Sequence, residues 1–290
     1  MGRDLYDSFP QAKEIFDKAN DILGFDLRAL CFHGPVEKLS TTSFSQPAIL
    51  VVSIAALRAL ESQIDGLEVG AALGLSLGEY SALVSAGSID FKEALELVNT
   101  RGRLMEEASK ENPGKMASIL GLDREVVEGV CREAGCEIAN LNCPGQIVIS
   151  GRIESIDRAT SMAKERGAKR SVGLDVSGPF HSSLMKPAAD RLNGLLNNVI
   201  VKRPSFPVVS NVDASYETDA ETIKSNLLTQ LTNRTYWEDS IKFLAKEGIK
   251  TFLEIGPGRV LKGLLRRIDP GLTVHNVGTT EDISNLMEAA

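Results

Sequence analysis

The sequence predicts an α/β fold, in which helices flank a parallel sheet and a smaller βαββαβ unit is inserted into the chain. Apolar residues at helical spacing dominate the first 110 residues. Near residue 116 the pattern changes to strand, helix, two strands, helix and strand. Towards the C-terminus short apolar segments alternate with helical ones, which is typical of a parallel sheet.

Four helices and one strand are expected before residue 110. Helical spacing of apolar residues covers residues 7–24, 45–63 and 90–109. A short apolar run at 69–73 has the character of a strand buried on both faces. A glycine-flanked turn and a helix over 78–87 come after it.

The order over residues 116–176 is the split-βαβ or ferredoxin-like arrangement. We therefore assign residues 115–177 to a small ferredoxin-like domain, inserted between residues 1–114 and 178–290 of a larger domain. After the insertion we expect a helix and three short strands, at 183–199, 207–212, 250–256 and 272–278.

Bulk composition excludes several classes of protein. The 290 residues are 43% hydrophobic and carry a net charge of −7, which argues against nucleic acid or an anionic membrane surface as the main partner. The four cysteines form no C-x-x-C pair and the three histidines show no metal-ligand spacing, so reduced thiols and no metal are expected. The apolar run before Arg58 is only about ten residues long, too short to cross a bilayer. With no apolar signal segment at the N-terminus, we expect a cytoplasmic protein.

Gly74-Leu75-Ser76-Leu77-Gly78 is a G-x-S-x-G pattern between the expected strand and helix. In a nucleophile elbow, small residues flank a strained, exposed serine because strand turns directly into helix. The backbone N–H of Leu77 would lie at the helix N-terminus and could donate to an oxyanion. The alternative is a packing turn whose serine has no catalytic role.

A serine nucleophile needs a base, and three histidines are candidates. His33 lies between helices, His275 lies in a C-terminal strand, and His181 lies after the small domain at the mouth of a helix. The usual hydrolase order of serine, acid and histidine favours His275, with Asp213 or Asp239 as the acid. The residue pattern alone does not decide between these histidines.

Five segments occur in the same order as in one known family: GLSLGEYSALV, RGRLMEEA, NCPGQIVISG, GPFHSSLMKPAA and EIGPGRVLKGL. Together they resemble the malonyl-CoA:acyl-carrier-protein transacylases of bacterial type II fatty acid synthesis, a family that shares its acyltransferase domain with polyketide synthases. The resemblance runs from residue 1 to about 268. It implies an α/β-hydrolase-like catalytic domain with the inserted small domain.

The resemblance also implies roles for particular residues. Ser76 corresponds to the acyl-carrying nucleophile and His181 to the catalytic base. Gln230 corresponds to the residue whose backbone carbonyl orients that histidine, so no acidic third member is needed. Arg101 corresponds to the arginine that binds the free carboxylate of malonate by paired hydrogen bonds. Phe180 resembles the malonyl-selecting members, in which a bulky ring crowds a branched acyl group.

The implied activity is transfer of a malonyl group from malonyl-CoA to the phosphopantetheine thiol of acyl carrier protein, through malonyl-Ser76 and with ping-pong kinetics. No bound cofactor is implied. Coenzyme A thioesters and a transient carrier-protein complex are the expected partners, with no nucleic acid and no membrane. A serine esterase or thioesterase, a polyketide-pathway acyltransferase, and a non-catalytic binding module are the alternatives.

The sequence departs from the family at two places. Leu75 stands where the family usually has histidine, and we expect it to pack. The family normally begins with a strand and a Gly-Gln-Gly-Ser-Gln segment, whose glutamine lines the oxyanion region. This chain begins with MGRDLYDSFP, which resembles the part of the family directly C-terminal to that segment, so the family's first strand is expected to be missing.

Overall fold

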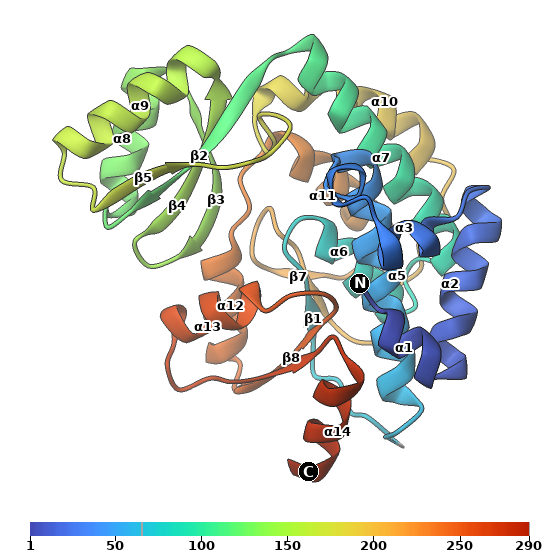
Figure 1. The fold of residues 1–290 in the computed structure, drawn as a ribbon. Helices are drawn as coiled ribbons and strands as arrows, with labels where there is room; N and C mark the ends of the chain where they lie inside the picture. Colours follow the sequence, from blue (N-terminus) through green and yellow to red (C-terminus); the bar gives the residue numbers. More distant parts are fainter. Residues whose placement is uncertain (65, 290) are drawn as a thin grey trace.

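The computed structural model describes residues 1–64 and 66–289 and is a mixed α/β structure (Figure 1). Its strands form three sheets. In the first, β1 (Ala72–Leu73) pairs in parallel with β6 (Val208–Val209), which pairs antiparallel with β7 (Tyr216–Glu217). In the second, β8 (Thr251–Ile255) and β9 (Thr273–Val277) are parallel. Parallel pairing beside β1 and within β8–β9 agrees with the sequence prediction.

Helices from the N-terminal part enclose the largest hydrophobic core. They are α1 (Arg3–Ser8), α2 (Pro10–Leu23), α3 (Leu27–His33), α4 (Val36–Leu39), α5 (Thr42–Glu61), α6 (Leu77–Ser85) and α7 (Phe91–Glu111). The α2 helix ends at Gly24 in a left-handed C-cap, and the Asp90 side chain caps α7 at its N-terminus. The core helix α5 packs against α2 and α7.

The length of α5 corrects the sequence analysis. The helix is 20 residues long, and by length and composition alone it could cross a membrane. The expectation of a short run was wrong, because the helix begins at Thr42 and continues through Pro47 and beyond Arg58. Most of it is buried against other helices of the same chain: 72% of its most apolar window is inside the protein.

The strand before Ser76 is also shorter and less buried than predicted. Only Ala72 and Leu73 pair with a neighbour, and both are partly exposed. Val69, predicted to be in a strand buried on both faces, is exposed. β1 is also an edge strand: it pairs only with β6 among the described residues.

Residues 114–173 form a four-stranded antiparallel sheet in the order β3-β4-β2-β5. The elements are β2 (Gly114–Leu120), α8 (Arg124–Ala134), β3 (Glu137–Cys143), β4 (Gln146–Arg152), α9 (Ile153–Glu165) and β5 (Arg170–Gly173). The two helices cover the sheet and share a hydrophobic cluster with it. In Figure 1 this unit lies on one side of the molecule, well apart from α1 and α2.

The remaining elements return to the larger body. They are the 3₁₀ turn η1 (Ser183–Met185), α10 (Lys186–Leu196), α11 (Ala220–Thr232), α12 (Trp237–Lys246), α13 (Val260–Ile268) and α14 (Thr280–Ala289). The α10 helix packs on α7 and α11, which brings α11 close to the elbow between β1 and α6.

Candidate active site

Ser76 occupies a sharp turn between β1 and α6, with backbone angles φ 50° and ψ −104°. A non-glycine residue in such a region costs on the order of 1–3 kcal/mol and persists only where the surroundings impose it. The turn is tight on one side: a Cβ on Gly74 would lie 2.0 Å from the backbone carbon of Gly78. A Cβ on Gly78 would meet nothing within 4 Å. Of the two glycines in the G-x-S-x-G pattern, only Gly74 is therefore required for steric reasons.

His181 and Ser76 lie in direct hydrogen-bond contact. Nε2 of His181 is 2.9 Å from Ser76 Oγ, and Nδ1 is 2.8 Å from the backbone oxygen of Gln230. A carbonyl can only accept, so Nδ1 carries the proton and Nε2 accepts from the serine hydroxyl. This is the arrangement of a general base beside its nucleophile.

The buried environment of His181 favours the neutral imidazole. The side chain is 4% exposed. Burial first, and then the positive charge of Arg101, lower the pKa of His181 to about 4. The ring is therefore uncharged near neutral pH and able to accept a proton.

Arg101, on α7, points its guanidinium at the same serine. It is 1% exposed, and Nη2 donates to Ser76 Oγ at 3.1 Å and to Gln230 Oε1 at 2.9 Å. Nη1 donates to Gln46 Oε1 at 2.6 Å. The close approach of α7 to α5 depends on Gly102, where a Cβ would lie 2.8 Å from the backbone oxygen of Thr42. Arg101 is thus a buried cation, hydrogen-bonded to the neutral side chains of Gln46 and Gln230 and to Ser76 Oγ.

Three polar residues of this network were missed by sequence reasoning: Gln46, Glu79 and Asn211. Asn211 Oδ1 accepts from Ser76 N–H at 2.8 Å. Glu79 is fully buried, and its Oε2 accepts from the N–H of Asn211 and from Gln230 Nε2. A partial signal was available for Asn211, a polar residue that comes just after the apolar pair Val208-Val209.

Two carboxyl groups are buried beneath the elbow. Burial raises the pKa of Glu79 to about 7. Burial and the nearby Glu79 raise the pKa of Glu217, which is 3% exposed, to about 9. Glu217 is therefore protonated in the folded protein at neutral pH.

The alternative base and acids lie elsewhere. His275 is on β9, opposite Leu253 of β8, and among the described residues it makes no hydrogen bond to Ser76. Asp213 accepts from the N–H of Ser215, and Asp239 pairs with Arg124. His33 ends α3, with its ring edge-on to Phe32. Of the three candidate histidines, the structure brings only His181 to the serine.

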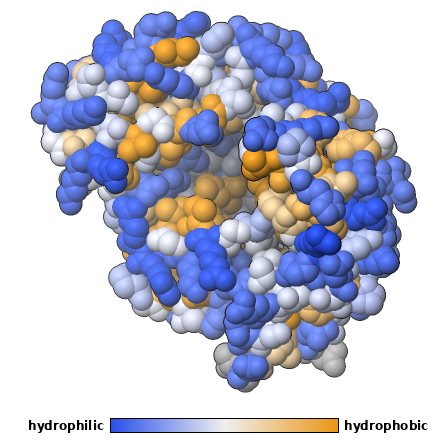
Figure 2. Space-filling view, viewed as in Figure 1, coloured by the Kyte–Doolittle hydropathy of each residue, from blue (hydrophilic) through white to orange (hydrophobic). Residues whose placement is uncertain are grey.

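A cleft of about 790 Å³ opens over Ser76 and His181. Figure 2 shows this face of the molecule hollowed near its centre, with hydrophobic side chains inside the hollow. Phe180, Leu75 and Leu77 line the cleft. The first-turn position of Leu77 in α6 leaves its N–H outside the helix ladder, and no acceptor for it is found among the described residues.

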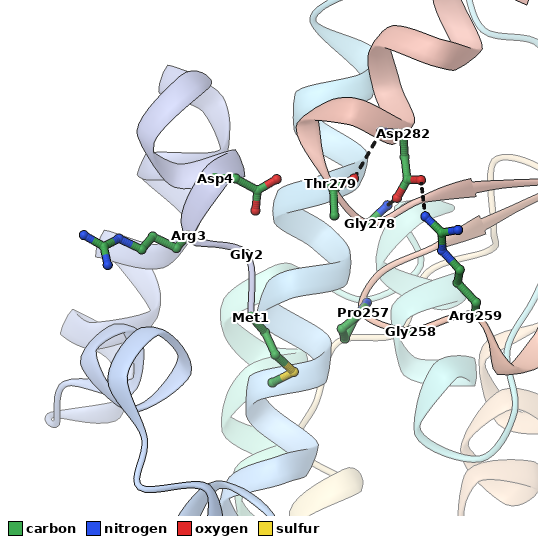
Figure 3. A pocket seen from close by; sticks show the side chains of 10 residues that line it. All are labelled: Met1, Gly2, Arg3, Asp4, Pro257, Gly258, Arg259, Gly278, Thr279 and Asp282. Atoms are coloured by element: carbon green, nitrogen blue, oxygen red, sulfur yellow. Dashed lines mark hydrogen bonds and ion pairs between the residues drawn. The ribbon is translucent and has the colours of Figure 1, made fainter.

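A second pocket, of about 410 Å³, lies away from this centre (Figure 3). It is formed by the start of α1 and by the loops before α13 and α14. Arg259 and Asp282, both in its lining, form an ion pair with one another (Figure 3). None of the residues that surround Ser76 lines this second pocket.

A strained serine at a helix N-terminus, a neutral histidine in contact with it and a cleft above them define a serine enzyme of the acyl-transferring or acyl-hydrolysing class. Comparison with known proteins identifies the family: the family described as "Acyl transferase domain" matches residues 1–277. The chain belongs to this acyl transferase family.

Relatives over nearly the whole chain carry one name. The malonyl CoA-acyl carrier protein transacylase of Bacillus subtilis is 45% identical, over 98% of this chain and 90% of the relative. The Escherichia coli K12 protein of that name is 44% identical, over 99% of this chain and 94% of the relative. The solved transacylase from Coxiella burnetii has a TM-score of 0.96 at 40% identity, covering 99% of this chain and 92% of that one.

A second solved structure includes a partner. It is described as a type II PKS acyl-carrier protein in complex with its malonyl-transacylase. It matches with a TM-score of 0.96 at 44% identity, covering 100% of this chain and 95% of that one.

Proposed function

We propose that this enzyme transfers a malonyl group from malonyl-CoA to the phosphopantetheine thiol of acyl carrier protein, supplying extender units for fatty acid synthesis. One observation carries the proposal: Ser76 Oγ lies between His181 Nε2, at 2.9 Å, and Arg101 Nη2, at 3.1 Å. A nucleophile, its base and a buried cation for the free carboxylate of the acyl group thus meet at one atom. The names of the relatives agree with this reaction.

The first half-reaction forms an acyl-enzyme. His181 Nε2 takes the proton of Ser76 Oγ as that oxygen attacks the thioester carbon. The oxyanion receives a hydrogen bond from Leu77 N–H, strengthened by the N-terminus of α6. The C–S bond breaks, and the coenzyme A sulfur leaves with the proton from His181. Malonyl-Ser76 remains.

The second half-reaction reverses these roles. The phosphopantetheine thiol gives its proton to His181 and its sulfur attacks the ester carbon of malonyl-Ser76. The bond to Ser76 Oγ breaks, and Oγ takes the proton back. This sequence uses only groups of the chain and of its two substrates, so no resident cofactor is required.

Arg101 and Phe180 select the acyl group in this proposal. A guanidinium can bind the free carboxylate through two parallel hydrogen bonds, and the present partners of Arg101 include the neutral amide oxygens of Gln46 and Gln230. The ring of Phe180 lines the same cleft, where it would crowd a branched acyl group. Pocket sterics of this kind contribute about 1–3 kcal/mol per methylene.

Intact-protein mass spectrometry after incubation with malonyl-CoA or acetyl-CoA tests the reaction. We expect a malonyl adduct on the wild-type chain and none on Ser76→Ala. Addition of carrier protein should discharge the adduct to its thiol rather than to water, which separates a transferase from an esterase or thioesterase. Sequential kinetics without an acylated Ser76 would refute the proposal.

The fold supports a division into two domains. We infer an α/β-hydrolase-like domain of residues 1–114 and 178–290, and a ferredoxin-like domain of residues 115–177. The strand order β3-β4-β2-β5 and the separate hydrophobic cluster beneath α8 and α9 support the smaller one. His181 comes just after the second crossing between them, so the base lies at the domain junction.

We infer that the carrier protein is a transient partner in the cytoplasm. Because carrier proteins are typically acidic, a local basic patch would assist docking despite the net charge of −7. Two basic groups are candidates: Lys262, Arg266 and Arg267 on α13, and Lys164, Arg166, Lys169 and Arg170 around the end of α9. Arg166 and Arg267 already bind Glu133 and Gln146 respectively. The cations that remain for docking are Lys262 and Arg266 on α13 and Lys164, Lys169 and Arg170 near the end of α9.

A further inference from the structure

Asn211 spans the turn that carries Ser76. It lies just after β6, the strand that pairs in parallel with β1, so the strand register brings it beside the elbow. Its Oδ1 accepts from Ser76 N–H at 2.8 Å, and its Nδ2 donates to the Gly74 carbonyl at 2.7 Å. The side chain is 4% exposed. One amide therefore satisfies two backbone groups on either side of Leu75.

An amide suits this position because the two backbone groups differ. Ser76 N–H needs an acceptor, and the Gly74 carbonyl needs a donor. Both groups lie in the turn before α6, where no helix ladder pairs them. Because the Ser76 N–H is occupied by Asn211, Leu77 N–H is the nearby amide left free for an oxyanion.

Glu79 connects Asn211 to Gln230, the residue that orients His181. Its Oε2 accepts from the Asn211 backbone N–H at 2.8 Å and from Gln230 Nε2 at 3.0 Å. Gln230 Nε2 also donates to the Ser76 carbonyl at 3.1 Å. The backbone oxygen of the same glutamine holds His181. Glu79 Oε2 thus links Asn211, which holds the backbone of Ser76, to Gln230, which orients His181.

We propose that Asn211 and Glu79 are positioning residues of the acyl transfer: Asn211 holds the strained elbow, and Glu79 fixes Asn211 relative to Gln230. The inference rests on the proposed function. Neither side chain touches Ser76 Oγ or His181, so both act through other residues. Small displacements of a nucleophile reduce rates strongly, by about 10²-fold for 1 Å.

The test is the single-turnover rate of Ser76 acylation by malonyl-CoA, with kcat and KM measured separately. Asn211→Ala should lower the acylation rate about 10²-fold, while KM for malonyl-CoA stays within about threefold because Arg101 is intact. Asn211→Asp keeps the acceptor for Ser76 N–H but loses the donor to Gly74. We expect it to fall between the wild type and Asn211→Ala, and it replaces the alanine variant if that variant does not fold.

Glu79 offers a rescue experiment. Glu79→Ala removes the acceptor for two N–H groups and should slow acylation about 10²-fold. Glu79→Gln retains an acceptor oxygen and should recover most of the lost rate. Equal loss in both variants would overturn the anchoring role of Glu79.

Asn276→Ala is the matched control. Asn276 is also a buried asparagine, 8% exposed, whose Nδ2 donates to a carboxylate, that of Glu254. It lies on β9, outside the network around Ser76. Its loss should lower the thermal midpoint without changing the acylation rate of the folded protein.

The outcomes separate the two proposals. Wild-type acylation rates in folded Asn211→Ala and Glu79→Ala, or a raised KM with unchanged kcat, would overturn the positioning roles and leave the proposed function intact. No acylation of the wild type by malonyl-CoA would remove the proposed function and this inference together.

Discussion

Nδ1 of His181 donates to the backbone carbonyl of Gln230 over 2.8 Å, and this bond turns Nε2 toward Ser76 Oγ. A neutral carbonyl fixes the tautomer but offers less stabilisation to an imidazolium than a carboxylate would. Burial and Arg101 act in the same direction, against the charged ring. The site therefore keeps His181 in its proton-accepting form over a wide range of pH.

The lowered pKa of His181 should appear in the pH dependence of the acylation rate, at its acid limb. With the pKa of His181 lowered to about 4, acylation by acetyl-CoA should stay constant down to about pH 5, instead of falling near the ordinary histidine pKa of about 6.5. Removing the positive charge in Arg101→Ala should raise the pKa of His181 and move the limb to higher pH. Stopped-flow or quench-flow acylation between pH 4.5 and 8 tests whether the wild-type rate stays constant down to about pH 5 and whether the limb of the variant lies at higher pH. An acid limb near pH 6.5 in the wild type would contradict the lowered pKa of His181.

Arg101 should also discriminate between acyl groups. Arg101→Ala removes the cation proposed to bind the malonyl carboxylate, and loss of a buried charge partner costs about 2–5 kcal/mol. We expect kcat/KM for malonyl-CoA to fall by about 10²-fold or more, with a much smaller loss for acetyl-CoA. Arg103→Ala, on the same helix but exposed, is the matched control. Equal losses for the two acyl groups would exclude the carboxylate role.

The local part of this site could be predicted from the sequence, and the long-range part could not. The order strand, glycine, serine, helix indicated an elbow because all four signals lie within about 20 residues. The strand and the helix are each recognised by the period of their apolar residues. The partners of Ser76 lie 25 residues away at Arg101 and 105 residues away at His181. Periodicity does not encode which histidine reaches the serine, so the residue pattern left His33, His181 and His275 open until the resemblance was considered.

The supporting network was hidden for a different reason. Glu79 lies in the first turn of α6, where an acidic residue ordinarily faces solvent and complements the helix dipole. Here it is fully buried, and Asn211 and Gln230 supply N–H donors to its carboxyl group. Burial of a charged residue type depends on tertiary packing, which a single sequence does not show.

The two glycines of the G-x-S-x-G pattern should respond differently to alanine. The Gly74→Ala methyl would lie 2.0 Å from the backbone carbon of Gly78, so α6 must shift and carry Ser76 with it. Overpacking of this kind typically costs about 1–3 kcal/mol, and we expect acylation to be nearly abolished. Gly78→Ala has open space and should keep both activity and stability. Chemical denaturation with single-turnover acylation distinguishes the pair, and comparable losses in both would contradict the steric argument.

The stability of the protein should depend on the protonation of Glu217. Its pKa is raised to about 9 in the folded state by burial and by Glu79. In the unfolded chain its pKa is near the reference value of about 4.3. Between these values the folded state holds a proton that the unfolded state has lost, so stability falls as pH rises, by at most about 1.4 kcal/mol per pH unit.

Glu217→Gln removes this dependence while keeping an oxygen that accepts from Asn226, as Glu217 Oε1 does. The thermal midpoint of the variant should exceed that of the wild type by a margin that grows by several degrees between about pH 6 and pH 8. His181 acts in the opposite sense at lower pH: its lowered pKa makes stability fall as pH drops from about 6.5 towards 4. Because both proteins contain His181, its effect cancels in the difference, and a margin that is constant with pH would show that Glu217 is ionised in the folded protein.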